Sequence, residues 1–233
     1  MKNNVDLSII IPTLNEAINI GQLIDTLRAN LSNSINTELL IIDGGSNDAT
    51  VHIAQQKAVQ VFNGVQGRAR QMNLGAEKAK GKILYFLHAD TTPPVDFDKY
   101  ILNAISTKYE AGCFQMKFDS KSWFLNFFAW FTRYNYKLCR GGDQSLFITK
   151  KLFNKTKGFN EDYIIFEDNE FIGRLYQQTS FNILPQYVRT SARKYDELGT
   201  IKLQYHFGII HLKNYLGAGP DKLYDYYKRK IVV

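Results

Sequence analysis

Two apolar segments of the chain each end close to an aspartate. Residues 82–87 lead into His88-Ala89-Asp90 and then two prolines, and residues 39–42 lead into Asp43 and two glycines. A strand that ends in a carboxylate presents it at the open edge of a sheet, where α/β proteins bind ligands. A lone aspartate there could instead cap the next helix, and residues 43–46 could form an ordinary tight turn. Two carboxylates at one sheet edge suggest a site for a ligand or a metal.

The elements that must position these carboxylates alternate between strands and helices. Short apolar runs predict strands, and apolar residues at a helical period predict the helices between them. The expected strands are 7–11, 39–42, 59–62 and 82–87, and the expected helices are 17–31, 48–57 and 68–80. This order implies an α/β fold with a Rossmann-like, mostly parallel sheet and right-handed crossovers. Because these strands are apolar throughout, they should be buried on both faces.

After residue 94 the alternation becomes less regular. The expected elements are helices at 97–109, 122–138 and 167–178 and strands at 112–118 and 144–149. We expect them to form a mixed extension of the sheet, flanked by helices. No linker or repeat interrupts the 233 residues, so one domain spanning 1–233 is expected.

Composition restricts the class of partner and the compartment. No apolar run is long enough to cross a bilayer and none resembles a signal peptide, so a cytoplasmic location is expected. Cys113 and Cys139 lack metal-site spacing and are expected to be structural. The net charge of +7 admits nucleic acid, an anionic membrane surface or a phosphorylated substrate. The basic residues are dispersed and match no nucleic-acid motif, so nucleic acid is not an expected partner.

An aromatic stretch, residues 123–131, has two interpretations. Such a stretch is more often core than binding site, and core is the expectation here. The alternative is an apolar acceptor groove or a membrane-facing surface, supported by Arg133, Lys137, Arg140 and the basic tail. That alternative would suit a lipid-linked acceptor and peripheral contact with the inner face of the membrane.

Six short blocks in order resemble the inverting family 2 glycosyltransferases. Neither a GxGxxG fingerprint nor a Walker loop is present. The matching blocks are residues 9–16, 40–50, 87–91, 141–144, 166–168 and 190–194. The resemblance implies a GT-A fold, with a nucleotide-sugar-binding half at about 1–95 and an acceptor-binding half at about 96–200. A basic, aromatic and helical tail would occupy about 201–233.

The resemblance also implies roles for the residues at the strand ends. Asp43 would accept from the N–H of a uracil ring, while Pro12, Thr13 and Glu16 would border the base and ribose. Asp90 would bind Mg²⁺ or Mn²⁺ beside the donor diphosphate. The sequence departs from the family pattern at His88, where a second carboxylate is common. His88, with Ala89, would then contact ribose or phosphate, or His88 would hydrogen-bond the following turn.

By the same resemblance, Asp168 is the general base. Inverting transfer needs one carboxylate that removes the proton of the acceptor hydroxyl as this hydroxyl attacks the anomeric carbon. The adjacent Glu167 would cap the helix or help to bind the acceptor. Without the resemblance, the two acids would be interpreted as favourable charges at a helix start.

The remaining expected site residues are basic or lie in a glycine-rich block. Arg68 and Arg70 open a helix and could hold the diphosphate. Arg193 and Lys194 would belong to a loop that closes over the diphosphate. Gly142, Asp143 and Gln144 would line the acceptor side.

The leading hypothesis is a metal-dependent inverting glycosyltransferase that uses a UDP-sugar and a hydroxyl acceptor, lipid-linked or glycan. One alternative is a nucleotidyltransferase, although residues 12–16 are not its usual glycine-rich basic loop. The other is a catalytically silent nucleotide-sugar-binding module.

Overall fold

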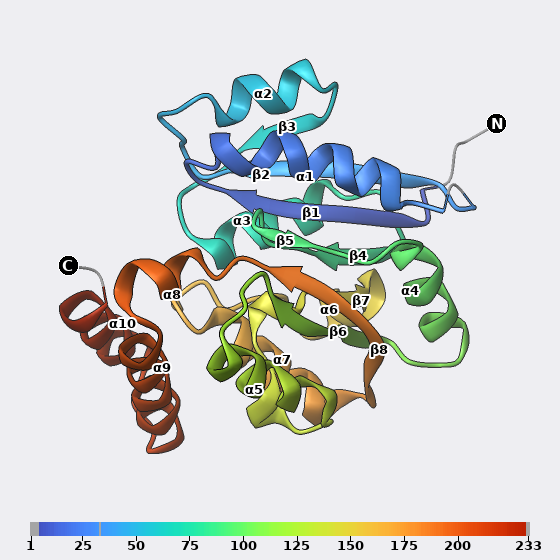
Figure 1. Ribbon diagram of the computed structural model, residues 1–233. Helices are drawn as coiled ribbons and strands as arrows, with labels where there is room; N and C mark the ends of the chain where they lie inside the picture. Colours follow the sequence, from blue (N-terminus) through green and yellow to red (C-terminus); the bar gives the residue numbers. More distant parts are fainter. Residues whose placement is uncertain (1–4, 33, 232–233) are drawn as a thin grey trace.

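One eight-stranded sheet organises the computed structural model, which describes residues 5–32 and 34–231 (Figure 1). The strand order is β3-β2-β1-β4-β7-β6-β8-β5. The strands are β1 (Leu7–Thr13), β2 (Thr37–Asp43), β3 (Gln60–Asn63), β4 (Ile83–Phe86), β5 (Thr91–Thr92), β6 (Ala111–Phe118), β7 (Leu146–Thr149) and β8 (Phe181–Thr190). The first four strands run parallel, and β7 joins antiparallel to β4 and β6. The predicted parallel sheet with a mixed extension is confirmed.

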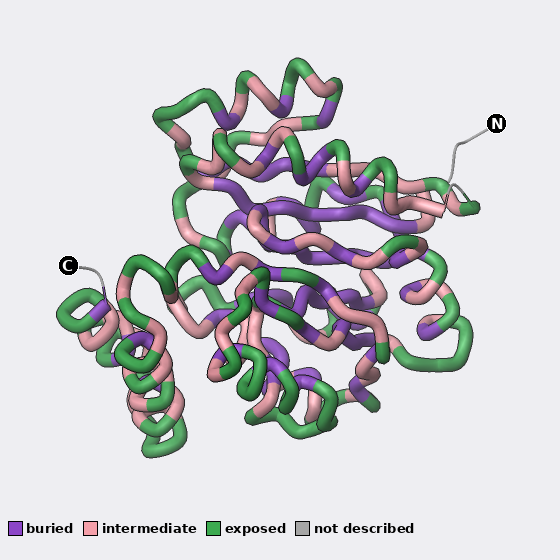
Figure 2. The backbone as a smooth tube through the Cα atoms, viewed as in Figure 1, coloured by how far each residue is buried: buried purple, intermediate pink, exposed green. Residues whose placement is uncertain are grey.

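Helices cover both faces of this sheet because its strands are apolar on both sides. Along β1, Ile9 and Ile11 point into one core and Ile10 into the other. The first core is covered by α1 (Ala17–Asn30), α2 (Thr50–Gln56), α4 (Phe97–Ser106) and α5 (Trp123–Trp130). The second is covered by α3 (Arg68–Lys78), α6 (Lys150–Lys155) and α7 (Glu167–Gln178). Figure 2 shows the buried strands between these layers.

Proline misled the strand prediction at two places. β1 continues through Pro12 to Thr13 instead of ending at residue 11. Pro12 is tolerated because β4 pairs with β1 only as far as Ile10, so no ladder partner needs its missing N–H. β8 was not predicted, and its Pro185 lies where the pairing with β6 shifts register. A bulge accommodates proline because the ladder is already interrupted there.

The expectation that residues 123–131 are core is wrong. α5 ends at Trp130, and only Leu125 and Ala129 of this helix are fully buried. Their four-residue spacing supplies one narrow apolar stripe that packs on β6. The indole of Trp123, in contrast, is 77% exposed. The short α6 was also missed.

Three helices follow β8 and form a small core of their own. They are α8 (Arg193–Leu198), α9 (Thr200–Tyr215) and α10 (Pro220–Lys230). Leu203, Ile210, Leu223 and Ile231 fill this core, and Phe166 from the segment before α7 packs against it. The expected tail at about 201–233 contains α9 and α10. No helix among the described residues is both long and apolar enough to cross a membrane.

Candidate functional site

A cavity of about 860 Å³ lies between α5, α9 and the start of α7. Apolar and aromatic side chains line much of it, including Phe128 of α5, Phe131 directly after α5 and Leu212 of α9. Charged side chains gather at one end of the lining: Arg68, His88, Asp143, Glu167 and Asp168. All five of these were predicted site residues. The cavity therefore joins an apolar compartment to a small polar centre.

His88 occupies the middle of that polar centre, between two carboxylates. Its Nε2 lies 3.6 Å from Asp168 Oδ2, and its Nδ1 lies 3.4 Å from Asp143 Oδ1. Burial of the ring disfavours the imidazolium, but the interactions with Asp143 and Asp168 outweigh it and raise the pKa of His88 to about 10. His88 is thus a cation, and its positive charge orients the Asp168 carboxylate. The predicted alternative, a hydrogen bond from His88 to the following turn, is not its side-chain contact here.

Gly142 makes room for this contact. A Cβ at position 142 would collide with Asp168 Oδ2 and would lie 2.7 Å from His88 Cε1. Gly142 opens the short 3₁₀ turn that also carries Asp143. Gly142 lets this turn approach Asp168 closely, so both Gly142 and Asp143 act on the polar centre.

Glu167 points inward rather than capping α7. The N-cap residue is Phe166, which has a φ of 69° and provides no side-chain cap. Glu167 is 2% exposed, and its Oε1 has no hydrogen-bond partner and lies 3.9 Å from Arg68 Nη1. Burial and the neighbouring Asp168 raise the pKa of Glu167 to about 7. The predicted cap role is wrong, and Glu167 belongs to the polar centre.

Arg68 is the basic residue that faces these acids. Partial withdrawal from water disfavours its charge, but the carboxylates of Glu167, Asp168, Asp143 and Asp90 outweigh this effect and raise the pKa of Arg68. The predicted partner Arg70 does not line the cavity and instead lies 3.9 Å from Glu161. Arg68 and Arg70 point in nearly opposite directions, because residues two apart on α3 lie about 200° apart around the helix axis.

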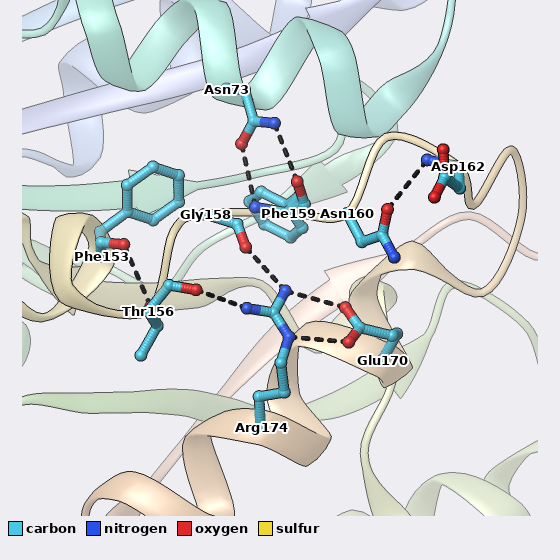
Figure 3. A network of polar contacts seen from close by, with 9 residues as sticks. All are labelled: Asn73, Phe153, Thr156, Gly158, Phe159, Asn160, Asp162, Glu170 and Arg174. Carbon is cyan, nitrogen blue, oxygen red and sulfur yellow. Dashed lines mark hydrogen bonds and ion pairs between the residues drawn. The ribbon is translucent and has the colours of Figure 1, made fainter.

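A network outside the cavity holds the segment that leads into Glu167 and Asp168 (Figure 3). The amide of Asn73, on α3, donates to Phe159 O and accepts from Phe159 N, both at 2.9 Å. Arg174, on α7, donates to Thr156 O, to Gly158 O and to both oxygens of Glu170. These contacts tie α3, which begins with Arg68, to the start of α7.

The carboxyl ends of β1, β2 and β4 meet at one edge of the sheet, as predicted. Asp43 is 2% exposed and accepts at Oδ1 from Thr13 Oγ1 and Ser46 Oγ, and at Oδ2 from the N–H groups of Gly45 and Ser46. A carboxylate has about four acceptor positions, and all are used here. A uracil N–H would have to displace one of these donors. The structure thus matches the tight-turn interpretation, and base reading by Asp43 stays a prediction.

The other donor-side residues lie around the same edge. Glu16 Oε1 is 3.8 Å from Arg193 Nη2, so the first residue of α8 reaches the start of α1. Neither Glu16 nor Arg193 lines the cavity. Pro12 lies within β1, and Ala89 packs into the core, which leaves its backbone to contact a ligand.

Asp90 is the predicted metal ligand. Its Oδ1 accepts one long hydrogen bond, 3.4 Å from Thr91 Oγ1, and its backbone O accepts from Ser191 N. Within the described residues, no group of three or more His, Cys, Asp or Glu side chains could hold a metal ion. A Mg²⁺-type ion can be held by one carboxylate, phosphate oxygens and water. The residues present fit an ion that is shared between Asp90 and a bound diphosphate, not a site built by protein alone.

Two polar residues of the cavity lining hold the backbone around it. Gln144, predicted to bind the acceptor, uses its side chain to accept from Arg140 Nη1 at 2.6 Å and to donate to Cys139 O at 2.7 Å. Arg140 is 3% exposed and also donates to Thr132 O and Tyr134 O. The assignment of Arg140 to a basic surface is therefore wrong. This pair fixes the backbone on either side of Gly142.

Sequence reasoning missed Asn73, which holds the segment before the site. Asn73 was not selected because an asparagine inside a predicted helix has no distinguishing pattern. Lys194, expected beside Arg193 in the loop over the diphosphate, lines the cavity and donates to Tyr227 Oη at 2.5 Å. Its role toward a diphosphate stays a prediction.

The comparisons with known proteins agree with this arrangement. The model of the family described as Glycosyl transferase family 2 matches residues 8–182. Glycosyltransferase AglE of Haloferax volcanii is 33% identical over 94 residues, which cover 37% of this chain and 31% of that protein. The chain thus spans about a third of the length of this curated relative.

Solved structures show the same fold at low sequence identity. S. aureus TarS residues 1–349 in complex with UDP-GlcNAc has a TM-score of 0.66 at 17% identity, over 80% of this chain and 58% of that one. Mannosyltransferase PcManGT from Pyrobaculum calidifontis, in complex with GDP-Man and Mn²⁺, has a TM-score of 0.68 at 17% identity, over 95% and 69%.

Glucosyl-3-phosphoglycerate synthase from Mycobacterium tuberculosis, in complex with Mn²⁺, UDP and glucosyl-3-phosphoglycerate, has a TM-score of 0.66 at 16% identity, over 92% of this chain and 81% of that one. These likenesses confirm the predicted GT-A fold. The family model, in turn, covers the sheet from β1 to the start of β8, together with the polar centre. The chain therefore belongs to glycosyl transferase family 2.

Proposed function

We propose that this chain is an inverting glycosyltransferase that moves a hexose-type sugar from a nucleotide diphosphate donor, UDP-linked, to an acceptor hydroxyl. The observation that carries the proposal is Asp168, held by His88 at the end of an 860 Å³ cavity beside the donor edge of the sheet. Family membership and the nucleotide sugars bound by the structural neighbours support the donor class. No observation favours the nucleotidyltransferase alternative.

Asp168 acts as the general base. The acceptor hydroxyl enters from the cavity, Asp168 takes its proton, and the oxygen bonds to the anomeric carbon as the bond to the diphosphate breaks. One displacement inverts the configuration at that carbon and needs no covalent intermediate. His88 positions Asp168, and Asp143 holds the far side of the imidazole.

Positive groups receive the departing diphosphate. Arg68 lies at the polar centre, and Arg193 reaches the donor edge beside Glu16. Asp90 would hold Mg²⁺ or Mn²⁺ together with the diphosphate, and such an ion supplies Lewis-acid stabilisation of the leaving charge. The Mn²⁺ present with two of the neighbours supports this part of the proposal.

The acceptor carries an apolar portion under this proposal, lipid-linked rather than a bare glycan, because much of the cavity lining is apolar and aromatic. We also propose a cytoplasmic site of action, as expected from the sequence.

A thermal-shift series with UDP-sugars, with and without Mn²⁺, tests the donor class. A ligand stabilises the folded state according to its concentration relative to its Kd. We expect a rise in Tm with a UDP-sugar plus Mn²⁺. In a separate incubation, water should replace the acceptor and slowly hydrolyse the UDP-sugar to UDP and a free sugar, whose first-formed anomer is inverted. No stabilisation by any nucleotide sugar would reject the donor assignment. A retained configuration would reject direct displacement by a hydroxyl activated by Asp168.

A further inference from the structure

The exposed large apolar side chains are concentrated in two segments, residues 123–138 and 201–216. We call them together the α5–α9 surface. Its exposed members are Trp123, Phe127, Phe128, Trp130, Phe131, Tyr134, Tyr136 and Leu138 in the first segment, and Ile201, Tyr205, Leu212, Tyr215 and Leu216 in the second. Single exposed apolar residues are ordinary on a protein surface, but a contiguous group of this size marks an interaction site.

The two segments lie on the same side of the molecule. Phe128 and Phe131 from the first and Leu212 and Tyr215 from the second line one cavity. Figure 1 places α5 and α9 at the end of the molecule away from α2 and β3, and Figure 2 shows exposed residues along both. The α5–α9 surface therefore surrounds the apolar part of the cavity.

The charged side chains in and directly beside these segments are all positive. No Asp or Glu occurs from residue 120 to 142 or from 198 to 220, whereas Lys121, Arg133, Lys137, Arg140, Lys202 and Lys213 do, and of these Arg140 is buried. Arg133 lies over the ring of Trp130, 4.6 Å from its centroid. Aromatic rings combined with basic side chains, without acids, complement an anionic lipid surface.

We propose that the α5–α9 surface docks on an anionic lipid bilayer, with the cavity open toward the lipid. Trp and Tyr side chains would sit at the headgroup level while Lys and Arg meet the lipid phosphates. The proposed contact is made by the exposed side chains of this surface. The proposal rests on the surface and its charge, and it holds whatever reaction the polar centre performs.

Sedimentation with vesicles tests the docking without any donor or turnover. We expect the protein to bind vesicles of phosphatidylcholine containing about one third phosphatidylglycerol at least about tenfold more tightly than pure phosphatidylcholine vesicles, and to be released by high salt. The double variant Trp123→Ser/Leu216→Ser removes side chains that are 77% and 73% exposed and do not line the cavity. Its binding to the anionic vesicles should fall at least about tenfold.

A matched control is available elsewhere on the protein. Ile18→Ser/Val95→Ser removes two apolar side chains of similar exposure, 87% and 64%, from the other half of the molecule and should leave vesicle binding unchanged. Equal losses in the two double variants, or no binding to anionic vesicles, would overturn the proposal.

A second pair of variants tests the charge. Lys121→Glu/Lys202→Glu should abolish the preference for anionic vesicles, while Lys108→Glu/Lys151→Glu, which reverses two exposed lysines outside the α5–α9 surface, should retain it. Light scattering without vesicles tests the alternative that a second copy of the chain covers this surface. A dimer that Trp123→Ser/Leu216→Ser dissociates, with no vesicle binding by the unaltered chain, would assign the surface to a second copy instead.

Discussion

Gly142 lies directly against the carboxylate of Asp168, with no space for a methyl group between them. The contact joins the 3₁₀ turn that carries Asp143 to the first turn of α7. Because His88 also lies against Gly142, this glycine sets the spacing of the whole polar centre.

Gly142→Ala should therefore lower turnover more than stability. A Cβ forces Asp168 and His88 apart, and a displacement of about 1 Å at a reacting group can reduce the rate about 100-fold. Steady-state UDP release and Tm measure the two effects. Gly141→Ala is the matched control, since its Cβ would meet nothing closer than Asn169 Oδ1 at 3.9 Å. Similar losses of turnover in both variants would show that position 142 has no special role.

Asp168→Asn should retain donor binding and lose transfer by a factor of about 100 or more, the usual size of a general-base contribution. Calorimetric titration with UDP measures the first property, and single-turnover transfer measures the second. Asp162→Asn, on the exposed part of the segment before α7, serves as control. Near-normal transfer by Asp168→Asn would place the base elsewhere.

Glu167 should make stability depend on pH. Its pKa is raised from 4.5 to about 7 by burial and by Asp168, so the folded state holds this proton more tightly than the unfolded state. The resulting stabilisation is complete below about pH 4.5 and is lost as pH rises through 7. At about 1.4 kcal/mol per pKa unit, the loss is about 3 kcal/mol.

Glu167→Gln removes this titration. Urea unfolding from pH 5 to 8 should show the free energy of unfolding of the unaltered chain falling relative to that of the variant. Glu161→Gln, at a half-exposed carboxylate, should run parallel to the unaltered chain. If the Glu167→Gln curve is also parallel, the proton is not held at this position.

Asn73→Ala should reduce stability and activity together. It leaves the N–H and C=O of Phe159 without their partners, which costs about 1–3 kcal/mol when such groups are buried. It also loosens the tie between α3 and the segment before α7. Urea unfolding and UDP release report the two losses. Asn160→Ala, which removes only the local hydrogen bond to Asp162 N, should have less than half the effect on stability.

Asp90→Asn should remove metal-dependent donor binding while preserving the fold. The one hydrogen bond described for the Asp90 side chain is the long 3.4 Å contact with Thr91 Oγ1, so Tm without ligands should change little. Titration of UDP with and without Mn²⁺, and after chelation, measures the metal contribution. An unchanged Mn²⁺ effect in the variant would contradict the assignment of Asp90.

The sequence predicted the parallel half of the fold well because apolar strands and amphipathic helices alternate there with clear boundaries. β8 was missed because Pro185 resembled a boundary, although a bulge accommodates it. The polar centre was predicted through short blocks that each carry a local pattern. Asn73 and Arg140 could not be found in this way, since the partner of Asn73 is 86 residues away and the importance of Arg140 depends on burial.

The short pairing of β5 with β8 joins distant parts of the chain. Thr91 is paired with Thr190, and Ser191 donates to the backbone of Asp90, so α8 starts beside the aspartate proposed to hold the metal. The C-terminal helices are thus anchored at the donor edge and also form a wall of the cavity. The same two-residue strand pair therefore links the sheet edge proposed to hold the donor to the helices of the proposed membrane surface.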